Sequence, residues 1–400
     1  ATAKQKNAVT PALTLEVFAA DGRPLAHYTP IVPKAMASEA LAKEAATEPP
    51  APANVPTSDE LYLTGLHLEQ YRHATRQPEL YWREALRRDP GDSRCHLALG
   101  RWHLRRGEFA DAERHLRASI ARQTFRNPNP ADGEPLYQLG RCLRLKALFD
   151  ANTADALASE ALAEEAFAKA TWNHAWRSAG HLALAEIACT RADWSAALAH
   201  LENSRRLDTD NLRARGLAAV VLRRLGRDAE AAALLQDTLR LDPLDVWARH
   251  LAGQTLPADN QFRLDLALDY ARAGLFAEAL GVVADADTTA TDGTAPLVSY
   301  YRAWLAHQLG DTKSVAIHLA DAASAAPDYC FPARLEEITI LQFALAANPR
   351  DARAPFYLGN LFYDRRRHQE AIKLWERAVR LEPANAVAWR NLGIAYFNIL

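Results

Sequence analysis

The pattern of apolar and polar residues changes its period once along the chain, near residue 57. Residues 13–18, Leu-Thr-Leu-Glu-Val-Phe, alternate with a period of two, and Asp21-Gly22 supplies a turn before a second β-prone run at 25–29. This pattern predicts a β-hairpin. A lone hairpin is only marginally stable in water, so we interpret 1–32 as the remnant of a preceding sheet domain.

Prolines at positions 33, 49, 50, 52 and 56 bracket an Ala/Glu/Lys-rich run, which predicts a linker over residues 33–56. From residue 57 onward the pattern repeats every 34 residues. The same offsets between small, large and proline residues recur in the stretches 212–245, 296–329, 352–385 and 386–400.

Each repeat combines small and large apolar residues in a way that suits two antiparallel helices. Small residues such as Gly359 and Ala371 let the helices approach, and large residues such as Phe362 and Trp375 fill the space beside them. A proline, for example Pro383, ends the second helix and starts the turn into the next repeat. No such unit buries its apolar face alone, so the units must stack.

The order Trp, Leu-Gly, Tyr, then Ala, Phe, Ala, Pro resembles that of tetratricopeptide (TPR) repeats. The resemblance implies an all-α fold, a right-handed α-α superhelix, over residues 57–400, with about eight or nine units. Two stretches, 246–256 and 330–347, break the two-helix rhythm, and residues 146–157 contain an insertion. The unit that begins at residue 386 has only its first helix, so we interpret it as truncated.

Three further segments, 61–73, 127–134 and 391–395, are similar to a family of large bacterial proteins that join an N-terminal β-sandwich region of uncharacterised function to a TPR array. That resemblance implies architecture only. From this resemblance we expect the polar cluster at the end of the first helix to contact the missing β domain. The cluster consists of His67, Tyr71, Arg72 and His73.

Composition and charge exclude several functional classes. Hydrophobic residues make up 49% and glycines only 17 of 400, which favours a helical, folded chain. With a net charge of −2, the chain has no overall positive potential that would attract nucleic acid, although residues 61–145 carry 15 arginines against 10 acidic residues. No apolar run is long enough to span a membrane. Four scattered cysteines predict reduced thiols and a cytoplasmic protein: Cys95, Cys142, Cys189 and Cys330.

Motifs for catalysis, metals and cofactors are absent from the sequence. His96 and His103, like His174 and His181, are seven residues apart, but core packing is a better interpretation of them than metal ligation. Asp265 and Asp269 share a helix face, which we interpret as a solvated outer face. We therefore expect no enzyme activity, no metal and no cofactor.

The concave groove of the superhelix is the predicted binding site. The non-consensus positions that the TPR pattern turns into this groove are Arg94, Leu97, Arg101, Tyr300, Trp304, His307, Phe356, Asn360, Tyr363 and Arg390. Groove aromatics anchor extended peptides. The competing interpretation is that the extra helix at 330–347 covers the aromatic residues.

Two functions follow from this sequence. The first is a non-catalytic scaffold that binds a protein or peptide in the groove, with no nucleic acid and no membrane as partner. The alternative is the accessory helical region of a larger carbohydrate-acting enzyme whose β-sandwich domain is missing from this chain.

Overall fold

The computed structural model describes residues 14–29, 47–73, 75–149, 153–257, 259–288 and 292–399, which belong to two units, 1–50 and 51–400. In the first unit, β1 (Leu15–Phe18) pairs antiparallel with β2 (Pro24–Tyr28), and Gly22 makes the turn at a φ of 83°. This is the predicted hairpin. The outer parts of the predicted remnant and most of the predicted linker lie outside the described residues.

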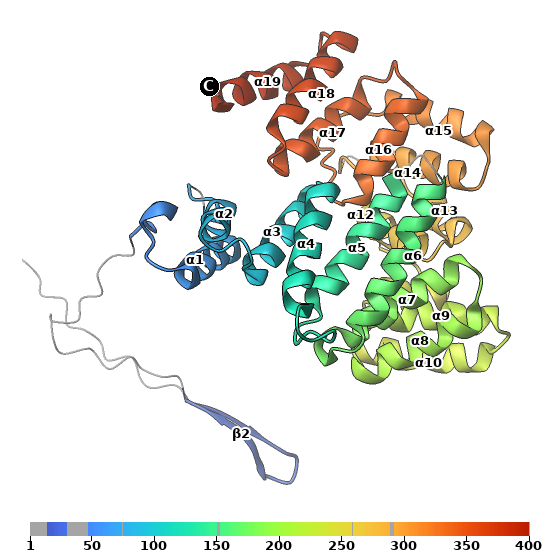
Figure 1. Ribbon diagram of the computed structural model, residues 1–400. Helices are drawn as coiled ribbons and strands as arrows, with labels where there is room; N and C mark the ends of the chain where they lie inside the picture. Colours follow the sequence, from blue (N-terminus) through green and yellow to red (C-terminus); the bar gives the residue numbers. More distant parts are fainter. Residues whose placement is uncertain are drawn as a thin grey trace, which may run out of the picture. The chain divides into compact units, whose positions relative to one another are not determined.

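The second unit is a series of antiparallel helical hairpins (Figure 1). They are α1 (Ser58–Tyr71) with α2 (Pro78–Arg88), α3 (Ser93–Arg106) with α4 (Phe109–Thr124), α5 (Glu134–Phe149) with α6 (Thr153–Ala170), α7 (His174–Thr190) with α8 (Trp194–Leu207), α9 (Leu212–Arg224) with α10 (Asp228–Leu241), α12 (Asn260–Arg272) with α13 (Phe276–Ala284), α14 (Ala295–Gln308) with α15 (Thr312–Ser324), and α17 (Arg353–Asp364) with α18 (His368–Leu381). The all-α solenoid predicted from the sequence is confirmed.

Other helices stand outside this pairing. They are the 3-10 helix η2 (Pro52–Asn54), the six-residue α11 (Val246–Leu251), the single helix α16 (Glu336–Ala347) and α19 (Ala386–Ile399). Helices α11 and α16 lie in the two stretches where the sequence rhythm breaks. Helix α16 packs against both α14 and α17.

Short polar caps and left-handed turns set where the helices begin and end. The Asp92 carboxylate accepts hydrogen bonds from the amides of Arg94 and Cys95 at 2.9 and 3.2 Å, and Asp193 and Asp311 cap α8 and α15 in the same way. Gly107 ends α3 in the left-handed region, at a φ of 72°. The turns are short, so consecutive helices pack antiparallel.

The two helices of a hairpin meet where a glycine faces a large ring. A Cβ built on Gly359 would lie 2.5 Å from the Trp375 ring, so no larger residue fits there without movement. The same contact joins Gly65 to Trp82 and Gly140 to Phe167. The last pair spans the insertion that the sequence predicts at 146–157.

The core is shared between hairpins. One continuous cluster of buried side chains runs from Leu182 on α7 to Ala395 on α19, and two smaller clusters cover α1–α3 and α3–α7. Each hairpin therefore depends on its neighbours for burial, as expected for a repeat array.

Repeats that are far apart in the sequence also touch. The Arg106 guanidinium donates to the Arg366 carbonyl at 3.2 Å, and Arg367 donates to the carbonyls of Arg106 and Gly107 at 3.1 and 3.3 Å. We call these four residues the clasp. Figure 1 shows α17 and α18 beside α3 and α4, and α16 also contacts α5. The array thus curls back on itself.

The glycine–ring contact predicts opposite effects for two glycine-to-alanine changes. Gly359→Ala should lower the free energy of unfolding by about 1–3 kcal/mol, because its methyl group overpacks against Trp375. Gly281→Ala, in α13, meets nothing within 4 Å and should raise it by up to about 1 kcal/mol. Urea unfolding of both variants measures the difference. Equal changes in the free energy of unfolding of the two variants would contradict the close packing of Gly359 against Trp375.

Candidate functional site

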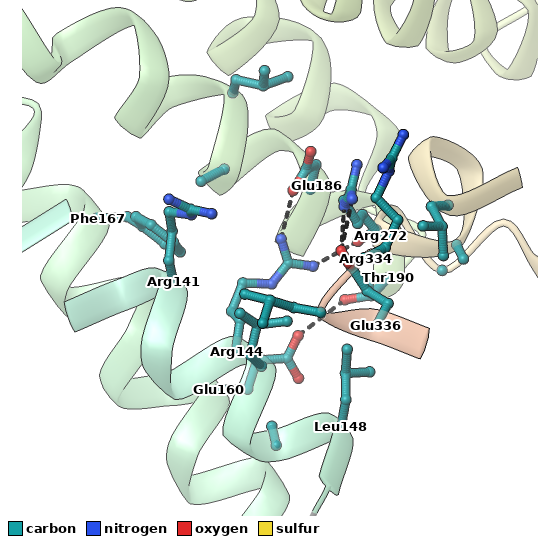
Figure 2. A pocket seen from close by; sticks show the side chains of 18 of the residues that line it. Arg141, Arg144, Leu148, Glu160, Phe167, Glu186, Thr190, Arg272, Arg334 and Glu336 are labelled. Carbon is teal, nitrogen blue, oxygen red and sulfur yellow. Dashed lines mark hydrogen bonds and ion pairs between the residues drawn. The ribbon is translucent and has the colours of Figure 1, made fainter. Parts of the chain in front are cut away.

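The curled array forms a partly open cavity of about 740 Å³. Its walls come from α3, α5, α6, α7, α9, α12, α13 and α14, together with the start of α16 and the end of α17. Cavities of this size accommodate small ligands or a few side chains of a partner. Figure 2 shows the side chains that line it.

One wall of the cavity is apolar. Leu145 and Leu148 contribute to it from α5 and Leu157 from α6, and the last two lie within the predicted insertion at 146–157. Leu148 and Leu157 are 44% and 62% exposed. This wall therefore presents aliphatic surface to solvent within the cavity.

The rest of the lining is strongly cationic. Seven arginines and three glutamates contribute side chains, namely Arg105, Arg141, Arg144, Arg213, Arg272, Arg334, Arg365, Glu160, Glu186 and Glu336. The arginines come from helices that are widely separated in the sequence, so only the curl of the array brings them together.

Glu186 on α7 is the centre of an ion network. Its carboxylate accepts from Arg144 of α5 at 2.6 Å (Figure 2) and from Arg213 of α9 at 3.0 Å. Arg144 also donates to the Arg272 carbonyl at 2.5 Å. The Glu186 side chain is 9% exposed, so these contacts are poorly screened by solvent.

A second set of contacts ties the chain before α16 to α12. Arg272 donates to Glu336 from Nε at 2.8 Å and from Nη2 at 2.7 Å, and Arg334 makes a bidentate pair with Asp265 at 2.8 Å. Burial raises the pKa of Glu336, but the Arg272 charge outweighs it and holds that pKa below its usual value. Glu336 and Arg272 are therefore both charged at neutral pH.

Arg141 differs from the other cavity arginines. It donates to the Gln138 side chain at 3.1 Å, and no carboxylate in the described part of the chain forms an ion pair with it. Its side chain is exposed on the cavity wall beside Phe167 (Figure 2). Arg141 is therefore a cation available to a ligand.

The aromatic residues predicted for the groove lie in the core instead. Tyr300, Trp304 and Phe356 are 0%, 4% and 5% exposed, and of the predicted groove residues only Trp304 touches the cavity. The reason is the competing interpretation given above: α16 packs on α14, and His307 stacks on Phe343 of α16 at 4.6 Å. These buried rings do not offer a binding surface.

The other predicted groove residues hold the array together. Arg94 pairs with Asp59 and Asp92, and Arg101 lies within ion-pair distance of Glu69 and Glu134 on neighbouring repeats. At the far end of the array, three more predicted residues take part in side-chain hydrogen bonds. Asn360 accepts from Trp375 and Asn391, Tyr363 accepts from Asn398, and Arg390 donates to Asn391. Leu97 is buried.

The predicted inter-domain cluster splits into two parts. His67 and Tyr71 contact each other on the exposed surface of α1, with ring centroids 4.6 Å apart. Arg72 instead ends the helix in the left-handed region, and His73 Nδ1 accepts from the Arg76 amide at 3.1 Å. Arg72 is exposed like His67 and Tyr71, whereas His73 is half-buried.

Asp265 and Asp269 also lie elsewhere than predicted. They pair with arginines around the cavity and do not form a solvated outer face. A single helix pattern does not reveal this, because their partners Arg213 and Arg334 belong to other repeats.

None of the four cysteines lines the cavity. The four cysteines are buried and unpaired, and burial raises the pKa of Cys142 and Cys189 to about 12. Among the described residues no group of histidine, cysteine and acidic side chains has the arrangement to hold a metal ion. Nor does any helix described here have the length and apolar character needed to cross a bilayer.

Family models match several parts of the helical array. A model described as "Tetratricopeptide repeat" matches residues 79–127, 182–246 and 338–375, and one described as "TPR repeat" matches 359–399. The Gly359–Trp375 contact described above lies inside the matched residues. The matched parts of the array are tetratricopeptide repeats.

Several solved structures are similar to the TPR array at low identity. YrrB, a TPR protein described as having an unusual peptide-binding site, is 14% identical, with a TM-score of 0.37 over 48% of this chain and 90% of that chain. A tetratricopeptide repeat protein from Parabacteroides merdae is 13% identical, with a TM-score of 0.34 over 76% and 98%. The human IFIT1 dimer with m7Gppp-AAAA is 15% identical, with a TM-score of 0.39 over 82% and 72%.

The ion network predicts that Glu186 is far more important for stability than a surface glutamate. Glu186→Gln should cost about 3–5 kcal/mol, because it leaves Arg144 and Arg213 without their shared carboxylate. The matched control Glu165→Gln removes an exposed pair with Lys169 and should cost under about 0.5 kcal/mol. Urea unfolding measures both. If the two substitutions lower the free energy of unfolding by similar amounts, the Glu186 network is screened by solvent like the surface pair, and the prediction is wrong.

Proposed function

We propose that the TPR array is a non-catalytic scaffold that holds a segment of a protein partner in its interior cavity. The single observation that carries this proposal is that one cavity is lined both by Arg141, which has no ion-pair partner among the described residues, and by the apolar side chains of Leu145, Leu148 and Leu157. A binding site needs apolar surface for affinity and a few polar groups for orientation, and this cavity offers both.

The chemistry of the cavity favours a partner segment with a carboxylate next to an aliphatic side chain. The chain itself provides an example, because Glu336 enters the cavity from the start of α16 and its carboxylate is held by Arg272. Arg141 offers the same kind of contact to a second carboxylate. The arginines and leucines project from helices that are packed against their neighbours. The cavity therefore loses little conformational entropy when a partner binds.

A second candidate function is the accessory region of a larger enzyme with a β-sandwich domain. The observation that favours it is the exposed surface of α1, where Leu63 and Tyr71 are 60% and 67% exposed beside His67. Such a surface suits contact with another domain. The four unpaired cysteines support a cytoplasmic location for either function.

The test is a selection of peptides from a random display library against the wild-type array, followed by affinity measurements with synthetic peptides. Arg141→Glu should weaken binding of the selected peptides by about tenfold or more, because a charge-assisted contact becomes a repulsion. The matched control Arg240→Glu lies on α10, outside the cavity, and should leave the affinity unchanged.

Two results would contradict the scaffold proposal. One is a library that yields no binder. The other is a set of selected peptides that bind wild type and Arg141→Glu equally well.

A further inference from the structure

Two hairpins contain a histidine pair in the same place. His96 on α3 and His115 on α4 have their Nδ1 atoms 2.9 Å apart, and His181 on α7 and His200 on α8 have theirs 3.1 Å apart. The members of each pair are 19 residues apart in the sequence. Each pair therefore joins the two helices of one hairpin through a single ring-to-ring hydrogen bond.

The location of the protons in the first pair follows from its third partner. His96 Nε2 lies 3.0 Å from the Pro90 carbonyl oxygen, which can only accept, so Nε2 carries a hydrogen. Neutral His96 then has a lone pair on Nδ1, and His115 Nδ1 donates to it. A proton added to His96 would place two N–H groups face to face and break the bond.

The surroundings of the first pair disfavour an added proton. Arg83 from α2, Arg114 from α4 and His103 from α3 face His115, and His103 stacks on it at 5.5 Å. The nearby Glu108 carboxylate is bound by His103 and Arg106. Burial, followed by these neighbouring cationic groups, lowers the pKa of His115 to about 3.

The second pair has a more balanced environment. Arg177 from α7 and Arg206 from α8 face His181, whereas Glu164 from α6 and Asp193 at the start of α8 face His200. Burial is the main cause that lowers the pKa of both histidines. The two carboxylates partly offset the cost of a charge there.

We propose that the two histidine pairs make the packing of α3 against α4, and of α7 against α8, sensitive to protons at mildly acidic pH. Above the usual histidine pKa of about 6.5, each pair shares its hydrogen and the hairpins are closed. As the pH falls below that value, the opened hairpin takes up protons that the closed one excludes, so opening becomes more favourable. The α3–α4 hairpin responds more strongly, because arginines and histidines face His115 whereas two carboxylates face His200.

This response would reach the clasp. Arg106 and Gly107 lie in the turn between α3 and α4, and this turn accepts the hydrogen bonds from Arg367. Separation of α3 and α4 therefore weakens the contact between the two ends of the curled array.

The chain offers matched substitutions for the test. His115 and His200 each lie three residues after a buried alanine, Ala112 or Ala197, and Leu234 and Leu374 occupy the same place after Ala231 and Ala371 in other repeats. His115→Leu and His200→Leu therefore introduce the residue that sibling hairpins already use. His174→Gln changes an exposed histidine on α7 and is the control.

Hydrogen–deuterium exchange at pH 7.5 and 5.5, corrected for the intrinsic pH dependence, measures the opening of each hairpin. In the wild type, the opening of α3–α4 should rise by up to about tenfold per pH unit below 6.5, and that of α7–α8 by less. His115→Leu should abolish the rise in α3–α4 alone, and His200→Leu in α7–α8 alone. His174→Gln should behave as wild type.

Two outcomes would overturn the proposal. The first is a loss of protection spread evenly over all helices. The second is an unchanged pH response of α3–α4 in His115→Leu. If His115→Leu does not fold, imidazole NMR of the wild type decides, because titration of His115 near pH 6.5 without any change in exchange would also overturn it.

Discussion

Arg144 connects repeats that are distant in the sequence, and the interior of the array depends on this connection. Its guanidinium binds Glu186 on α7 and the carbonyl of Arg272 at the end of α12, and Arg272 in turn holds Glu336 at the start of α16. A straight stack of hairpins would keep these groups apart. The ion network therefore stabilises a curled array, and the cavity is the space that the curl encloses.

The sequence predicts each hairpin but not the curl. Small and large residues at fixed offsets, such as Gly359 and Trp375, indicate which helix faces meet, and the prolines indicate where the second helices end. These contacts are local. Even the irregular features were visible, because α11 and α16 lie in the stretches that break the rhythm and the Gly140–Phe167 contact spans the insertion.

The candidate site was harder to predict, because it consists of contacts between repeats. Trp304 occupies a groove position in its own repeat, yet α16 returns over α14 and the ring is 4% exposed. Arg141 gave no signal, and Asp269 was assigned to a solvated face, since a charged residue on a helix is usually solvated. Their importance depends on how far the array curls, and that is decided by many small inter-helix angles.

The most direct test of the curl is the distance between the two turns of the clasp in solution. Spin labels on cysteines introduced at Ala110 and Gln369, both exposed and close to those turns, allow pulsed electron paramagnetic resonance to measure it, and the native cysteines are buried. The structure predicts a short and narrow distance distribution. A long, broad distribution would mean that the array is uncurled, and it would contradict the cavity on which the proposed function depends.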